Sequence, residues 1–84
     1  MNIIFFGSPS YSCNVLKTLL TSQHNIAAVV TQNTKNKRDK RTPVSIYSEA
    51  NNLDTLYPED LKSKNFLKKI SDYKPDLFIV YAYG

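Results

Sequence analysis

Five cations lie within seven residues near the middle of the 84-residue chain, and they are its clearest candidates for polar chemistry. They are Lys35, Lys37, Arg38, Lys40 and Arg41. With Asp39 this segment sums to a charge of +4, which equals the formal net charge of the whole chain. Closely spaced cations can neutralise several phosphates of a nucleic acid and release the bound counterions. The segment therefore predicts a charge-driven nucleic-acid contact, with a solvated surface loop as the alternative interpretation.

A second candidate is the turn Gly7-Ser8-Pro9-Ser10, which follows four large apolar residues. Ser8 suits a helix N-cap and Pro9 the first helical position, so free N–H groups should face whatever binds there. The turn has one glycine and matches neither the dinucleotide-binding nor the phosphate-loop pattern, and Pro9 lacks an N–H. The spacing therefore does not favour a nucleotide phosphate site.

The remaining reactive residues form no catalytic or metal-binding pattern. His24, the only histidine, lies in a polar turn before an apolar run, where we expect a structural or solvated role. Cys13 is the only cysteine, so no intrachain disulfide is possible, which fits a reducing cytoplasm. The carboxylates are scattered and metal-ligand spacing is absent. We assign no catalytic residue and no metal ligand.

Apolar periodicity predicts the elements that position these residues. Short apolar runs predict strands at residues 2–6, 26–31, 53–57 and 77–83. Helical spacing predicts helices at 9–22, from Pro43 to Asn51-Asn52, and from Ser63 to a stop before Pro75. Thr42 and Ser63 are expected to cap the second and third helices. Residues 32–42 are expected to form a loop.

This alternation predicts an α/β fold: part of a Rossmann-like, doubly wound parallel sheet with three helices and four strands in the order 3-2-1-4. The winding reverses between the first and fourth strands, which opens a crevice at their carboxyl ends. Gly7, Ser8 and Pro9 should lie on one side of it, with Tyr83 and Gly84 on the other. The basic loop should rise from the same edge of the sheet.

The last predicted strand is apolar on both faces, although nothing after it could pair with it. We therefore expect residues 1–84 to be the front part of a larger domain, truncated at its active-site end. An exposed apolar edge also predicts self-association through residues 77–83. The longest apolar runs, residues 3–6 and 77–82, are far too short to span a membrane.

Several short motifs together resemble one family. Residues 3–11, Ile-Ile-Phe-Phe-Gly-Ser-Pro-Ser-Tyr, are similar to the I-x-F-x-G-T-P-x-F opening of methionyl-tRNA formyltransferases. Residues 80–84, Val-Tyr-Ala-Tyr-Gly, resemble the family's V-x-A-Y-G. Further matches occur in order at 24–26, 30–32, 42–44 and 57–58. Each motif is short, but together they cover the whole chain.

The resemblance implies a reaction that moves a formyl group from 10-formyltetrahydrofolate to the amino group of methionyl initiator tRNA. It implies that Tyr11 helps line the methionyl pocket, that the basic loop enters the tRNA acceptor end, and that Tyr83-Gly84 leads into the folate pocket. The family's catalytic asparagine, histidine and aspartate lie downstream of the Ala-Tyr-Gly strand. The chain alone is therefore expected to be inactive.

Two other functions remain open. The basic loop is shorter than is usual in the family and contains no glycine, so a sugar N-formyltransferase is one alternative. A carboxyl-terminal β-barrel domain in the full-length protein would instead indicate tRNA. A non-catalytic RNA-binding module that uses the basic loop is the second alternative. A glycinamide ribonucleotide formyltransferase is disfavoured, because its first turn is glycine-rich and this one contains Pro9.

Overall fold

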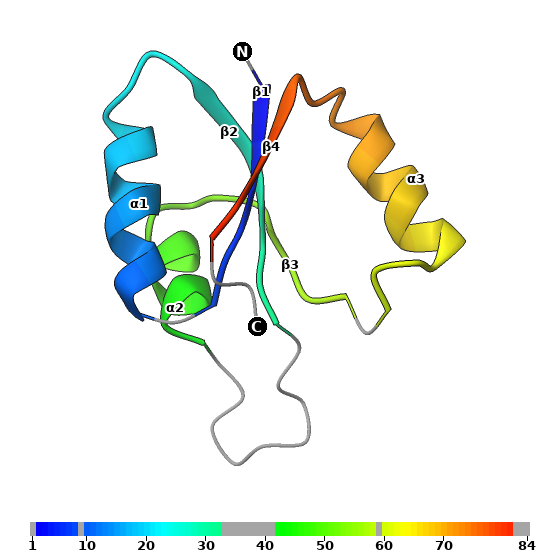
Figure 1. Ribbon diagram of the computed structural model, residues 1–84, viewed down its shortest axis with the longest axis horizontal. Helices are drawn as coiled ribbons and strands as arrows, with labels where there is room; N and C mark the ends of the chain where they lie inside the picture. Colours follow the sequence, from blue (N-terminus) through cyan, green and yellow to red (C-terminus); the bar gives the residue numbers. More distant parts are fainter. Residues whose placement is uncertain (1, 9, 33–41, 59, 82–84) are drawn as a thin grey trace.

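The computed structural model describes residues 2–8, 10–32, 42–58 and 60–81, which form three layers (Figure 1). A central sheet has α1 and α2 on one face and α3 on the other (Figure 1). The elements in chain order are β1 (Asn2–Phe6), α1 (Ser10–Leu20), β2 (Asn25–Val30), α2 (Pro43–Ala50), β3 (Thr55–Leu56), α3 (Lys64–Asp72) and β4 (Leu77–Val80). The predicted element types and their order are confirmed.

The predicted sheet topology is also confirmed. The described strands pair in the order β3-β2-β1-β4, and all the pairs are parallel. β1 is therefore central, and β4, the last strand in sequence, lies beside the first. The connection through α3 runs from β3, the outer strand on one side of the sheet, to β4, the outer strand on the other side. That jump creates the reversal of winding between β1 and β4.

A bulge interrupts the pairing of β1 with β2. Ile3 pairs with Ile26, but Ile4 pairs with Ala28, so β2 has one extra residue at Ala27. Side chains alternate between the faces of a regular strand, and an extra residue reverses the alternation beyond it. As a result Ile26 and Val29, three residues apart, both pack on the face that α1 and α2 cover.

Each face of the sheet has its own core. The α1 and α2 side buries Ile3, Phe5, Leu16, Ile26, Val29 and Val44. The α3 side buries Ile4, Ala28, Val30, Leu56 and Ile70. β1 contributes to both cores through alternate residues, as expected for a central parallel strand.

Side-chain caps set the starts of α2 and α3 as predicted. The Thr42 hydroxyl accepts a hydrogen bond from the Ser45 backbone N–H at 3.0 Å, and the Ser63 hydroxyl accepts one from the Phe66 N–H at 3.1 Å. α2 ends where predicted, and Asn52 follows it with a left-handed φ of 60°. Lys74 has a φ of 53° between α3 and Pro75.

The bounds of β1 are as predicted, whereas those of α1, β2, β3 and β4 differ from the predictions by one to three residues. α1 spans Ser10–Leu20 and ends two residues before the predicted end at 22, because Thr21 and Ser22 form a turn whose hydroxyls donate back to helix carbonyls. Residue 9, the predicted start, lies outside the described residues. β3 contains only Thr55 and Leu56 instead of residues 53–57, and β2 begins and ends one residue early. β4 ends at Val80, and residues 82–83 of the predicted strand lie outside the described residues.

Candidate functional site

The carboxyl ends of β1, β2 and β4 meet at one edge of the sheet, where the first turn lies. The Gly7 N–H donates to the Val30 carbonyl at 3.0 Å, which holds the turn against the end of β2. A Cβ atom on residue 7 would lie 2.7 Å from Cε2 of the buried Phe5 ring and 3.1 Å from Cβ of Ser12. A side chain at this position would therefore force the Phe5 ring to shift.

A buried hydroxyl cluster, formed by Ser8, Thr31 and Thr42, connects this turn to both ends of the predicted basic loop. The Thr31 Oγ1 lies 3.4 Å from the Ser8 Oγ and 2.6 Å from the Thr42 Oγ1. The Ser8 hydroxyl also accepts the Gln32 N–H at 3.0 Å, while its carbonyl accepts the Val44 N–H. All three hydroxyl-bearing residues are buried, so the cluster fixes where the chain leaves β2 and where it enters α2.

Two tyrosine rings lie side by side near the carboxyl ends of β1 and β4, where the winding of the sheet reverses. Tyr11, in the first turn of α1, is 58% exposed, and its ring centroid lies 6.0 Å from that of Tyr81 in an edge-to-face arrangement. The Ser12 hydroxyl donates to the Tyr81 carbonyl at 2.8 Å, which ties α1 to the end of β4. Such rings offer an apolar surface together with hydroxyl groups that can form hydrogen bonds.

Only part of the predicted site falls within the described residues. Gly7, Ser8 and Tyr11 lie together at the predicted edge of the sheet. Pro9, Tyr83, Gly84 and the cations Lys35, Lys37, Arg38, Lys40 and Arg41 lie outside the described residues. Gln32 and Thr42, which flank the basic segment, both lie beside the first turn through the hydroxyl cluster.

Sequence reasoning missed Tyr81 and the hydroxyl cluster. The alternation along the strand contains a signal for Tyr81, because Ile79, two residues earlier, packs on the face that α1 covers. The sequence pattern predicts only a strand end at Thr31 and a helix cap at Thr42. Their contact depends on a loop whose closure the sequence pattern does not specify.

The other reactive residues lie where no shared chemistry arises. His24 is exposed just before β2, at the amino ends of the strands, where its backbone N–H donates to the Ser22 hydroxyl. Cys13 is half-buried in α1, and burial raises the pKa of its thiol while a backbone hydrogen bond partly opposes this shift. Among the described residues, no three histidine, cysteine or acidic side chains gather as metal ligands do. The described part of the chain also has no helix long and apolar enough to cross a membrane.

The strand order and the residues at the reversal of winding define a class of fold. A parallel sheet in the order 3-2-1-4 with helices on both faces is a partial Rossmann-like α/β fold. Ligands of such domains bind outside the carboxyl ends of the strands. No family model matches the sequence.

Curated proteins give a closer comparison. The chain is 44% identical over 89 aligned positions to methionyl-tRNA formyltransferase of Francisella philomiragia, and 38% identical over 88 to that of Acetivibrio thermocellus. It is 41% identical over 90 positions to methionyl-tRNA formyltransferase of Prochlorococcus marinus. In each case the whole chain aligns, but it covers only 27–28% of the relative. The chain is thus related over its full length to the amino-terminal part of the methionyl-tRNA formyltransferases.

Proposed function

We propose that this chain is the amino-terminal part of a formyltransferase domain that transfers the formyl group of 10-formyltetrahydrofolate to methionyl initiator tRNA in the cytoplasm. The observation that carries the proposal is the full-length match, at 38–44% identity, to three proteins with that name. The crevice at the reversal of winding is the place where a domain of this class binds its ligands. The chain contributes binding surface there, while catalytic residues come from polypeptide that follows it in the full-length protein.

In this proposal the crevice residues bind the two substrates. Gly7, Ser8, Pro9 and Tyr11 form the wall beside the methionyl amine, while Tyr83 and Gly84 form one lip of the folate pocket. The assignment of Tyr11 to the methionyl wall is supported by its exposed ring, which lies beside Tyr81 near the carboxyl ends of β1 and β4. Apolar ring surface suits the methionyl side chain and leaves the amine free to attack the formyl carbon.

The basic segment is proposed to contact tRNA phosphates. Support comes from the hydroxyl cluster, which holds both flanking residues, Gln32 and Thr42, beside the first turn. A loop that starts and ends there is anchored next to the proposed methionyl wall. No aromatic residue lies between Gln32 and Thr42, so contacts should depend on charge with little base preference.

The enzyme proposal is tested with a chimera in which this chain replaces the matched part of the Francisella philomiragia relative. We expect the chimera to transfer formyl from 10-formyltetrahydrofolate to charged initiator tRNA, and the isolated chain to transfer none. A folded chimera that formylates only a nucleotide-linked amino sugar would overturn the tRNA assignment in favour of a sugar N-formyltransferase. The alignments contain at least four positions at which the relatives have a residue and this chain has none. For this reason both tRNA and the amino sugar are tested as substrates of the chimera.

The tRNA contact is tested in the same chimera by replacing four cations, Lys37, Arg38, Lys40 and Arg41, with alanine. We expect weaker tRNA binding and a shallower dependence of affinity on salt, because each lost phosphate contact reduces counterion release. The matched control replaces four cations in and just before α3: Lys62, Lys64, Lys68 and Lys69. It removes the same charge from another surface, so equal effects of the two variants would contradict the proposed contact.

The isolated chain is further proposed to self-associate through the edge strand β4. Leu77, Phe78 and Val80 are 44%, 51% and 66% exposed, although they are strand residues with large apolar side chains. Within the described part of the chain, β4 pairs with β1 on one side and with no strand on the other. That outer edge could pair with a strand of a second copy.

A further inference from the structure

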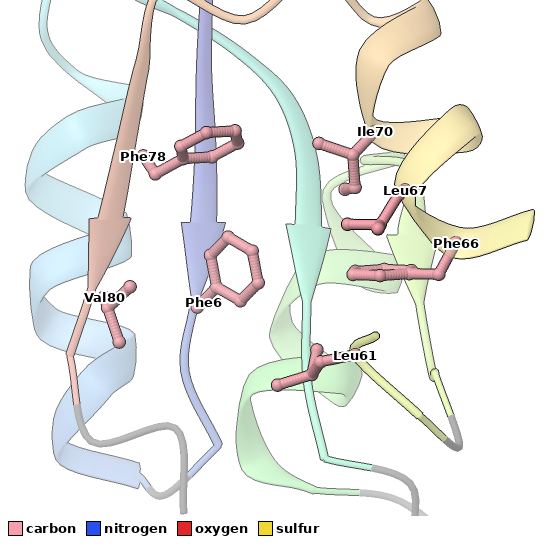
Figure 2. Close-up of a pocket in the computed structure, with 7 residues that line it drawn as sticks. All are labelled: Phe6, Leu61, Phe66, Leu67, Ile70, Phe78 and Val80. Atoms are coloured by element: carbon pink, nitrogen blue, oxygen red, sulfur yellow. The ribbon is translucent and has the colours of Figure 1, made fainter. Parts of the chain in front are cut away.

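An apolar groove of about 330 Å³ lies between α3 and the sheet (Figure 2). β1 and β4 contribute Phe6, Phe78 and Val80, while α3 contributes Phe66, Leu67 and Ile70. Figure 2 shows the two sets facing each other across an open space. No lining side chain is charged, so the groove is suited to apolar contact and not to a polar ligand.

The groove exists because the α3 face of the sheet is covered unevenly. α3 packs through Ile70 and Phe66 on a core that includes Val30 of β2 and Leu56 of β3. On β4, Phe78 and Val80 point to this face and are more than half exposed. Ile79, which points to the other face, is half-buried against the core beneath α1 and α2. β4 is therefore covered at Ile79 on one face and open at Phe78 and Val80 on the other.

The width of the sheet leaves room for a second helix beside α3. Four strands spaced about 4.8 Å apart span roughly 14 Å between the outer strand axes, and packed helices lie about 8–10 Å apart. Two helices, α1 and α2, cover the opposite face of the same four strands. A second helix on the α3 face would lie over β1 and β4, which is where the groove is open.

The topology also indicates which segment of a longer polypeptide would lie over β1 and β4 on the α3 face. α1 and α2 lie on one face because β1, β2 and β3 advance in one direction, and α3 lies on the other because β4 is reached in the opposite direction. Crossovers between parallel strands are right-handed in nearly all proteins, so the direction of travel fixes the face. A connection that continues outward from β4 must therefore pass over the α3 face.

We propose that the groove binds an amphipathic crossover helix from the polypeptide that follows the matched part in the full-length relatives, which this chain covers to only 27–28%. The helix would present apolar residues at i, i+3, i+4 and i+7 to Phe78, Val80 and Leu67. The inference rests on topology and on the length of the relatives. It does not require the proposed formyl transfer.

The first test co-expresses this chain with the part of the Francisella philomiragia relative that lies beyond the match. We expect the two to purify as a one-to-one complex that Val80→Asp prevents, because a carboxylate in the groove would be buried without a partner. The matched control is Ile46→Asp, which charges an exposed apolar residue of α2 on the opposite face and should leave the complex intact. Equal effects of the two substitutions would overturn the proposal.

The second test uses the chimera and does not depend on assembly of separate pieces. In a Cys13→Ser background, Val80→Cys should react with maleimide about tenfold or more slowly in the chimera than in the dilute isolated chain, because reaction then requires local opening. Ile46→Cys should react alike in both. Equal rates for Val80→Cys overturn the proposal. A second outcome would also overturn the proposal: the Val80→Cys thiol becomes protected in the isolated chain as its concentration rises, and the protection is unchanged in the chimera. In that case a second copy of the chain would occupy the groove. A chimera that protects Val80→Cys but transfers no formyl group would overturn only the enzyme function.

Discussion

Gly7 shows how one residue couples the sheet to the candidate crevice. It ends β1, bonds to the end of β2, and lies against the ring of the fully buried Phe5. Glycine is favoured at this position because there is no room for a side chain: a Cβ would lie only 2.7 Å from that ring. The ring cannot move aside easily, because close-packed core side chains have few alternative positions.

Gly7→Ala is therefore expected to lower the free energy of unfolding by about 1–3 kcal/mol, the usual cost of overpacking a core. Urea denaturation of the dilute chain measures this. The double variant with Phe5→Leu removes the colliding ring atoms, so its loss should be smaller than the sum of the two single losses. Strict additivity would mean that the collision is not the cause.

Thr42 combines two roles through one oxygen atom. Its hydroxyl accepts the Ser45 N–H at the start of α2 and lies 2.6 Å from the Thr31 hydroxyl in the cluster. A cap that is buried and shared with a second hydroxyl should contribute more than an exposed one, because its loss also leaves a buried partner unsatisfied.

Thr42→Val is expected to cost about 1–2 kcal/mol of unfolding free energy, since valine keeps the shape and removes the acceptor. Thr42→Ser, which retains the hydroxyl, should lose clearly less. The exposed Thr18 of α1 gives a matched control, because Thr18→Val should change stability by less than about 0.5 kcal/mol. Similar losses for Thr42→Val and Thr42→Ser would contradict the role of the hydroxyl.

Among the elements, the helices were predictable from sequence because their caps and stops are local. Thr42, Ser63 and Pro75 mark boundaries through groups a few residues apart. The bulge at Ala27 was not predictable, because an apolar run that is buried on both faces gives no sign of where the alternation reverses. The hydroxyl cluster was missed for the related reason that its members are 11 and 23 residues apart.

The end of α3 has an unfavourable backbone conformation. Lys74 has a φ of 53°, a left-handed conformation that costs a residue with a Cβ about 1–2 kcal/mol. It is held there because Pro75 cannot continue the helix, while the Lys74 N–H bonds to the Ser71 carbonyl at 2.9 Å. Glycine would adopt this conformation without the steric cost.

Lys74→Gly should therefore be more stable than Lys74→Ala by about 1 kcal/mol, although both lose the same charge. At Lys69, inside α3, the order should reverse, with alanine more stable than glycine by about 1 kcal/mol. Thermal or urea denaturation of the four variants gives both differences. The same order at the two positions would exclude the backbone explanation.

For the molecule as a whole, the exposed β4 strand predicts how the isolated chain behaves in solution. Sedimentation velocity should show association that increases with concentration. Val80→Lys should reduce it, because a charge on an open strand opposes edge pairing. Ile46→Lys, which changes a similarly exposed residue on α2, should leave it unchanged. A wild-type chain that stays monomeric at high concentration would contradict the proposal.

The position of β1 in the middle of the sheet has a consequence for synthesis on the ribosome. β1 is made first, yet it pairs with β4, and the Asn2 N–H bonds to the carboxylate of Asp76, 74 residues later. At about 5–20 residues per second, one edge of β1 must wait roughly 4–15 seconds for its partner strand to be translated. Throughout that interval the nascent chain presents Ile3, Ile4 and Phe5 without their final neighbour, so the unpaired side of β1 is open to non-native strand pairing while the chain is being made.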